Sequence, residues 1–462
     1  MSAIVAACNA GSGNGGTNTT GGQLATTTDE STNTTVAASD IKDNCDISTY
    51  AVCSYDPTTK TWTGIVKRTD YIEDGYINTE DEQLAVVNSG GSAKLFIGLN
   101  GVGGHAGTMG YINLKSAILS WDGTTLKTIH RDDNHKPRGD DWHIRGKNML
   151  AYTYNDNGNP VDGLVIGSTN GSVRFYDPAT QSWLELQGAG WRSDVSSMAV
   201  LPNQGTYPGL VVGLNNGWTF DYDYNGNKGS FTDLGRKTWR PITNIVDVSS
   251  QGAFYAGQND GSINRYDYKN KQWESGVLAA NGDNAVTEMV AYPAIDGIAV
   301  GLRNGKVKIY VSNSQWYDID SSSSAVTAMT NFGVGGNSIV WSTQDGAMYT
   351  RSTSETSTNS TSHQIVGKND WGGENHGNAT AFINTENNNS FIAGLAWGAV
   401  QQWNGTFNSS GNANFTLLKP SGLSGRHYAV KSMIWYDNKL IVAFGLGRGD
   451  IVHKQATQYS RR

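Results

Sequence analysis

The sequence predicts an all-β protein made of many short strands. Its 462 residues include 57 Gly, 21 Tyr and 14 Trp but only 9 Pro, and 16% of them are charged. Aromatic side chains suit the pleated, half-buried surface of a strand, whereas Gly and Asn tolerate the positive φ angles of tight turns. One phrase, NGSVRFYDPATQSW at residues 170–183, also recurs along the chain in related forms.

The recurrence has a period of roughly 40 to 50 residues, which is the length of one four-stranded propeller blade. Copies of the phrase begin at Gly163, Gly209, Gly252, Gly297, Ser338 and Phe391. Their turn glycines are Gly171, Gly217, Gly261, Gly305, Gly346 and Gly398. We therefore expect a β-propeller, in which each blade buries its faces against its neighbours.

Each copy can be divided into four strands, A to D. The apolar stretches VSSMAVLP (195–202) and GLVVG (209–213) are typical of inner strands A and B, which are covered on both faces. The Asn-Gly or Asp-Gly pair predicts a two-residue hairpin before strand C. Strand D carries a Trp, at Trp183, Trp273 and Trp316, which we expect to pack between neighbouring sheets.

The two ends of the chain complete the count of blades. Residues 84–101 and 117–129 would form a first blade, and residues 429–454 supply only inner strands. The missing outer half lies in YAVCSYDPTTKTWTGIV from Tyr50, where Trp62 aligns with Trp183. We expect about eight blades, with the ring closed by N- and C-terminal strands, or seven blades if one weak copy is an insertion.

The repeat resembles several propeller repeats at once. YDPATQSW is similar to the outer half of kelch repeats, and GSTNGSVRFYD resembles the B-to-C turn of WD-type and quinoprotein-type repeats. The resemblance covers about residues 50–455 as architecture. It identifies no single family, and it therefore carries over no functional residues.

The N-terminal segment predicts where the protein is located in the cell. SAIVAAC, which ends at Cys8, resembles the lipobox of bacterial lipoproteins, which implies cleavage of a signal before Cys8 and a lipid on this residue. Residues 1–8 would then be a signal remnant, and the polar residues 9–44 a disordered tether. Residues 45–462 would form a single propeller domain.

The cysteines and the charge refine this expectation. Cys45 and Cys53 are spaced to close a short disulfide, which indicates an oxidising compartment. The predicted location is the bacterial cell envelope, with a lipid anchor in the outer membrane and the head facing the periplasm or the surface. The net charge is -7, and the sequence has no run of Lys or Arg that would indicate nucleic acid as a partner. No apolar stretch approaches the ~20 residues of a membrane span, so the lipid alone would attach the protein to the membrane.

An irregular segment, HRDDNHKPRGDDWHIRG from His130, is the candidate partner-binding loop. Its candidate residues are His130, His135, Arg138, Asp140, Trp142 and His143. Its His and Asp residues suit a metal or a general base, but their spacing fits no recognised metal motif. We therefore assign no catalytic, cofactor or metal residues. Asp-rich turns at 155–163 and 221–229 would suit calcium, but they lack the EF-hand spacing and are also typical of hairpins.

We expect a noncatalytic binding or scaffold head that presents one propeller face to a protein partner, within a surface or secretion complex. The alternatives are a lectin-like carbohydrate-binding propeller, a glycan-active enzyme with carboxylates from separate blades, and a host-adhesion protein using Arg-Gly-Asp at 138–140 or 448–450. Tryptophans expected in loops would anchor a protein or stack on sugars. They are Trp142, Trp191, Trp218, Trp239, Trp371 and Trp397. The repeated Trp of strand D is explained by packing, which favours the scaffold.

Overall fold

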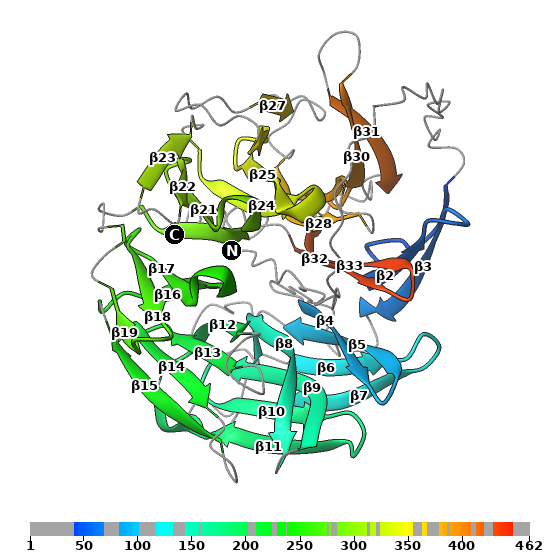
Figure 1. Ribbon diagram of the computed structural model, residues 1–462. Helices are drawn as coiled ribbons and strands as arrows, with labels where there is room; N and C mark the ends of the chain where they lie inside the picture. Colours follow the sequence, from blue (N-terminus) through cyan, green and yellow to red (C-terminus); the bar gives the residue numbers. More distant parts are fainter. Residues whose placement is uncertain are drawn as a thin grey trace, which may run out of the picture.

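Eight sheets stand in a ring around a common axis, and the four strands A to D of each are antiparallel (Figure 1). The computed structural model describes residues 41–68, 83–100, 116–132, 144–156, 159–191, 193–201, 209–223, 229–236, 238–274, 277–278, 284–311, 315–319, 324–353, 363–366, 378–385, 389–407, 413–419 and 428–446. The predicted β-propeller is confirmed, with eight blades rather than seven. Within these ranges, no helix is long and apolar enough to cross a membrane.

Each blade runs from strand A near the axis to strand D at the rim. Blade 1 holds β4 (Gln83–Ser89), β5 (Ser92–Asn100), β6 (Ser116–Trp121) and β7 (Leu126–Asp132). Blade 2 holds β8 (Ile144–Asp156), β9 (Asn159–Ser168), β10 (Val173–Asp177) and β11 (Ser182–Gln187). Blade 3 holds β12 (Val195–Leu201), β13 (Gly209–Leu214), β14 (Trp218–Asp223) and β15 (Ser230–Arg236). Blade 4 holds β16 (Ile242–Val248), β17 (Ala253–Gln258), β18 (Ile263–Asp267) and β19 (Gln272–Trp273).

The remaining blades complete the ring. Blade 5 holds β20 (Val286–Tyr292), β21 (Gly297–Leu302), β22 (Val307–Val311) and β23 (Gln315–Ile319). Blade 6 holds β24 (Val326–Phe332), β25 (Ser338–Thr343), β26 (Met348–Ser352) and β27 (His363–Val366). Blade 7 holds β28 (Ala379–Asn384), β29 (Phe391–Leu395), β30 (Val400–Phe407) and β31 (Ala413–Lys419). Blade 8 holds β32 (Tyr428–Tyr436) and β33 (Lys439–Leu446), followed by β2 (Tyr50–Asp56), β3 (Thr61–Lys67) and β1 (Lys42–Asn44).

Short 3-10 helices connect some strands. They are η3 (Ala189–Trp191), η4 (Ser249–Gln251), η5 (Pro293–Ile295) and η6 (Val334–Gly336). Helix η3 leads from blade 2 into blade 3, whereas η4, η5 and η6 join strands A and B of blades 4, 5 and 6. Because neighbouring strands are antiparallel, the A-to-B turns lie on one face of the ring, and the B-to-C turns and D-to-A connections lie on the other.

The closing blade joins the two ends of the chain, as the sequence predicts. β2 pairs antiparallel with β33, so the N-terminal strands form the outer half of this blade. A fifth strand, β1, pairs parallel with β3 at the rim. The folded part of the chain therefore includes Lys42–Asn44, which the sequence assigns to the tether. These three polar residues carry no strand pattern, and their pairing depends on distant contacts.

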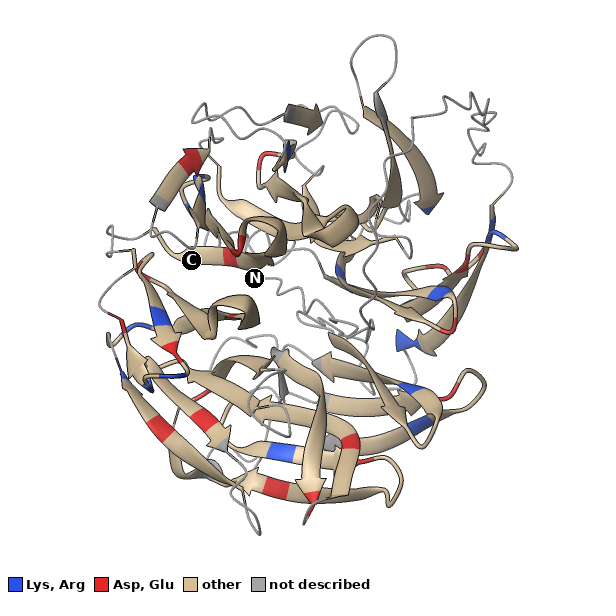
Figure 2. Cartoon of the chain, viewed as in Figure 1, with Lys and Arg blue, Asp and Glu red and all other residues tan. Residues whose placement is uncertain are grey.

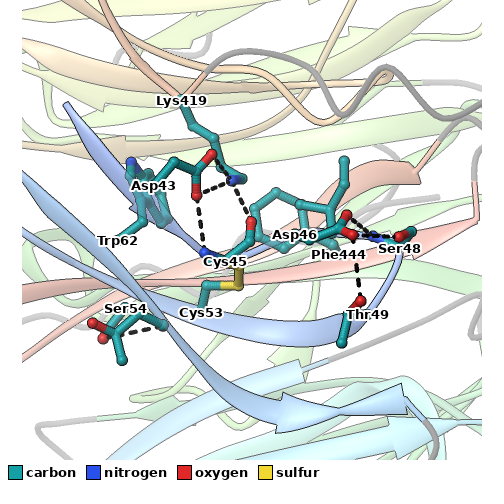
Figure 3. Close-up of a disulfide and its surroundings, with 12 residues drawn as sticks. Asp43, Cys45, Asp46, Ser48, Thr49, Cys53, Ser54, Trp62, Lys419 and Phe444 are labelled. Carbon is teal, nitrogen blue, oxygen red and sulfur yellow. Dashed lines mark hydrogen bonds and ion pairs between the residues drawn. A yellow bond between two sulfur atoms is a disulfide. The ribbon is translucent and has the colours of Figure 1, made fainter. Parts of the chain in front are cut away.

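A disulfide and a buried lysine hold this N-terminal segment in place (Figure 3). Cys45 and Cys53 are joined, with their Cα atoms 6.2 Å apart, and both are fully buried. The Lys419 ammonium, at the end of β31, donates to Asp43 Oδ2 at 2.7 Å and to the Cys45 carbonyl at 2.6 Å. Lys419 is 2% exposed. Burial lowers its pKa below the usual 10.5, although the Asp43 carboxylate opposes this shift.

The B-to-C turns differ from the predicted two-residue hairpin. In blade 2, the N–H of Gly171 donates to the Ser168 carbonyl and the N–H of Ser168 donates to the Ser172 carbonyl, which encloses three residues. Gly171 has φ +84°, whereas Asn170 is not in the positive-φ region. A type I′ turn needs positive φ at both positions, so this is instead a type I turn followed by a glycine bulge. Asn170 Oδ1 accepts the Ser172 N–H at 2.9 Å, which explains the Asn-Gly pair.

The seams between blades are built from complementary residues. A Cβ on the strand B glycine would lie less than 3 Å from a β-branched side chain at or near the start of the next strand A. The pairs are Gly167 with Val195, Gly213 with Ile242, Gly257 with Val286, Gly301 with Val326 and Gly394 with Val430. Blade 6 has Ser342 in place of glycine, and blade 7 there begins with Ala379, whose N–H donates to Ser342 Oγ at 3.0 Å. A larger residue on one side of a seam is therefore matched by a smaller one on the other.

The strand D tryptophans join neighbouring blades at the rim, as expected. The Nε1–H of Trp273 donates to the Leu234 carbonyl, and that of Trp316 donates to the Val277 carbonyl, both at 2.7 Å. Trp62 makes the same bond to the Leu418 carbonyl across the closing seam. Trp62 is fully buried and the other two are half-buried, and each indole uses its single donor on the preceding blade.

Candidate functional site

The irregular segment from His130 is placed only in part. His130 belongs to β7, where its ring lies edge-on to Trp183 of the next blade with centroids 6.3 Å apart. It is therefore a strand residue at a seam rather than a loop residue. His135, Arg138, Asp140, Trp142 and His143 lie outside the described residues, as does Cys8.

An aromatic patch stands out on the face that carries the B-to-C turns and the D-to-A connections. We call it the Trp239 patch, and its members are Trp191, Trp218, Phe220, Phe231, Arg236 and Trp239. They come from η3, from β14 and β15 of blade 3, and from the connection into blade 4. The patch is thus built almost entirely on one blade.

The base of the patch is a stack of rings. The Trp191 ring is stacked on Phe220 with centroids 4.2 Å apart and 15° between the planes, and it meets Phe231 edge-on at 4.9 Å. Trp218 is also stacked with Phe220, at 6.2 Å. These half-buried rings bury one another and hold the tip of blade 3 in a single arrangement.

The outer part of the patch combines two indoles with an arginine. The Arg236 guanidinium lies over the Trp218 ring, 5.2 Å from its centroid, and also over the Trp239 ring. Such cation–π contacts fix the guanidinium through its faces. Trp239 itself is 78% exposed. The other large hydrophobic residues that are exposed in the described ranges are Leu184, at 41%, and Val334, at 75% on η6 of the opposite face.

The backbone beneath Trp239 is closely fitted. A Cβ on Gly217, whose φ is +86°, would lie 2.3 Å from the Thr238 carbonyl oxygen and 2.8 Å from the Arg240 carbonyl oxygen. The turn of blade 3 and the connection that carries Trp239 can therefore approach only because residue 217 has no side chain. The exposed indole thus sits on a supported backbone.

One carboxyl group elsewhere has a raised pKa. Burial raises the pKa of Asp247 above its usual 3.8, against the opposing hydrogen bonds from Ser249 and Tyr268. Both hydroxyl groups donate to this carboxylate, so a local network accounts for it. Among the described residues, no group of three or more His, Cys, Asp or Glu side chains is arranged to hold a metal ion.

Comparison with solved structures supports the fold. Sqt1 from Chaetomium thermophilum is 14% identical with a TM-score of 0.58, over 82% of this chain and 98% of that chain. The same protein bound to the N-terminus of ribosomal protein L10 gives 14% identity and a TM-score of 0.56, over 81% and 98%. In sequence, no protein-family model and no curated protein matches the chain. The likeness at this identity concerns the fold alone.

The sequence predicts Trp191, Trp218 and Trp239 in loops but does not bring them together, and Trp218 is in fact the first residue of β14. Their association depends on how blade 3 meets its two connections, which no local pattern encodes. One local signal marks the site in the sequence: residues 236–240 read RKTWR, with three basic residues in a chain of net charge -7.

Proposed function

We propose that this protein is a noncatalytic, protein-binding propeller and that the Trp239 patch is its contact surface. The observation that carries the proposal is the indole of Trp239, which is 78% exposed on a preorganised support. Trp and Arg are enriched among the residues that dominate binding energy at protein interfaces. A similar propeller, Sqt1, is described as bound to the N-terminus of ribosomal protein L10, which supports this class of function.

The patch favours a protein partner over a lectin function. Repeated sugar pockets would need the same aromatic residue at the same offset in most blades. After the turn glycine, however, blade 3 has Trp218 whereas the other copies have Ser, Lys or Ala. The patch is therefore a single site among the copies of the repeat.

Replacing Trp239 with Ala should weaken partner binding at least tenfold, because truncation of a central interface Trp typically costs about 2 kcal/mol or more. A photo-crosslinking residue at position 238, next to an intact Trp239, would capture the partner, and titration of the purified partner would give the affinity of each variant. Val334→Ala, an equally exposed apolar residue on the opposite face, is the matched control and should bind normally. Full binding by Trp239→Ala would exclude the patch as the contact surface.

We also propose that the propeller is held at a bacterial envelope through a lipid on Cys8. The support is the lipobox-like SAIVAAC segment and the Cys45–Cys53 disulfide, which suits an oxidising compartment. Cys8→Ser should move the protein from the membrane fraction to the soluble fraction and abolish incorporation of labelled palmitate. Cys8→Ser that stays with the membranes would contradict the anchor.

A further inference from the structure

We infer that the segment which docks on the Trp239 patch is acidic: an apolar or aromatic side chain packs against Trp239, and flanking Asp or Glu side chains bind Arg236 and Arg240. This inference rests on the proposed function and adds the chemistry of the partner to it. Three features of the patch carry it.

The first feature is the way in which Arg236 is held. Its guanidinium has Trp218 on one side and contacts Trp239 as well, so the aromatic rings occupy its faces. The N–H groups of a guanidinium lie in its plane and match the two oxygens of a carboxylate. Because the rings already fix the orientation of Arg236, little side-chain entropy remains to be lost when a carboxylate binds.

The second feature is the local charge. Arg240, beside Trp239, is exposed, and within the described residues neither Arg236 nor Arg240 forms an ion pair. Asp233, the carboxylate earlier on β15, accepts the backbone N–H of Gly235 at 2.7 Å. Elsewhere, Lys and Arg are interspersed with Asp and Glu around the ring (Figure 2). RKTWR is thus a basic site on an acidic protein, which attracts acidic segments and repels basic ones.

The third feature is the size of the site. A single exposed indole with two guanidinium groups on one blade offers one apolar anchor and two charged contacts. It does not form the long basic groove with successive stacking platforms that a nucleic acid strand would follow. A short peptide with one apolar residue between carboxylates matches this arrangement.

The test mixes the full chain with fluorescein-labelled peptides and measures their binding by fluorescence anisotropy. The acidic probe is GSDEFDEGS, and its comparison probes are the amide form GSNQFNQGS, the basic form GSKRFKRGS, the form without an anchor GSDEADEGS, and a twelve-nucleotide oligo-dT. We expect the acidic probe to bind at least tenfold more tightly than each of the others. Its affinity should fall as NaCl is raised, since exposed charge pairs are screened.

Variants assign the binding to the residues. Arg236→Lys should lower the affinity for the acidic probe at least tenfold, because an ammonium cannot replace a stacked guanidinium that binds a carboxylate through two hydrogen bonds. Arg240→Ala should weaken it severalfold, and Val334→Ala should leave it unchanged. Circular dichroism melting of every variant would separate loss of binding from loss of fold.

Two outcomes would overturn the inference. One is equal binding of the acidic and amide probes, or an unchanged affinity in Arg236→Lys; the other is tighter binding of the basic peptide or of oligo-dT. If Trp239→Ala still weakens binding of the partner that crosslinking identified, in either case, the proposed contact surface stands and only the acidic chemistry fails. If Trp239→Ala retains that partner, the proposed function itself fails.

Discussion

Asp43→Ala should lower the free energy of unfolding by about 3 kcal/mol, because it leaves a buried ammonium without its carboxylate. Lys419 is 2% exposed, and in the variant its ammonium would keep the Cys45 carbonyl and the face of the Trp62 ring, 5.2 Å from the ring centroid, but no opposite charge at hydrogen-bond distance. The figure lies at the lower end for a broken buried ion pair, since the Asp43 side chain is 31% exposed and water can partly replace it. Urea denaturation at pH 7 would measure the difference.

The pH dependence gives a second readout of the same variant. Burial lowers the pKa of Lys419, and loss of Asp43 removes the opposing attraction and lowers this pKa further. The folded state then binds the Lys419 proton less tightly than the unfolded state does, so stability rises with pH between the lowered pKa and 10.5. The difference in free energy of unfolding between the native protein and Asp43→Ala should therefore shrink as the pH approaches 10.5.

Two further variants serve as controls. Asp46→Ala removes an exposed turn carboxylate that accepts from Ser48 and Thr49, and it should cost about 1 kcal/mol or less. Lys419→Met combined with Asp43→Ala should recover most of the loss, since it removes the buried charge. If Asp43→Ala alone stays within 1 kcal/mol of the native protein, the ion pair does not hold the N-terminal segment.

Gly301→Ala should destabilise the ring by about 1–3 kcal/mol, because the added methyl overpacks the seam between blades 5 and 6. A Cβ on residue 301 would lie 2.6 Å from Val326 Cγ1, so one of the two strands must move. Val326→Ala alone should also destabilise, by leaving a cavity. The loss in free energy of unfolding of the double variant should be less than the sum of the two single losses. The reason is that the double variant places two small side chains against each other, as Ser342 and Ala379 do at the next seam.

Gly98→Ala is the matched control for this cycle. It lies on strand B of blade 1, where its Cβ would be 3.4 Å from Met149 Sδ, an ordinary contact with a flexible side chain. We expect its free energy of unfolding to change by less than about 1 kcal/mol. Additive losses in the 301/326 double variant, measured by urea denaturation, would show that the two residues do not fit against each other as described.

The propeller and the closure of its ring could be predicted because the sequence of each blade is a repeat of the same pattern. Strands, turn glycines and rim tryptophans recur at matching offsets, and the outer half of the repeat at Tyr50 completes the inner half at the other end. The turn type was wrong because Asn-Gly also suits a type I turn with a glycine bulge, and the choice depends on the φ of Asn170. Local sequence does not decide that angle.

The features that sequence reasoning missed depend on distant partners. β1 is a strand because Asp43 meets Lys419, 376 residues further along the chain. The Trp239 patch exists because β14, β15 and two connections converge at the tip of blade 3. The three tryptophans of the patch could be named from the sequence, but Phe220, Phe231 and Arg236 could not, nor could the sequence show that these residues would meet or that Trp239 would remain uncovered.

The closing blade also sets an order in time. β2 and β3 are made early, but their partners β32 and β33 emerge only after seven other blades have been synthesised. Until then the edge of β2 that pairs with β33 is open, although Cys53 of β2 can already meet Cys45. Pairings between such distant residues form slowly, and exposed strand edges promote aggregation. The ring therefore cannot close before the last two strands have been made, and the N-terminal strands are exposed to aggregation until then.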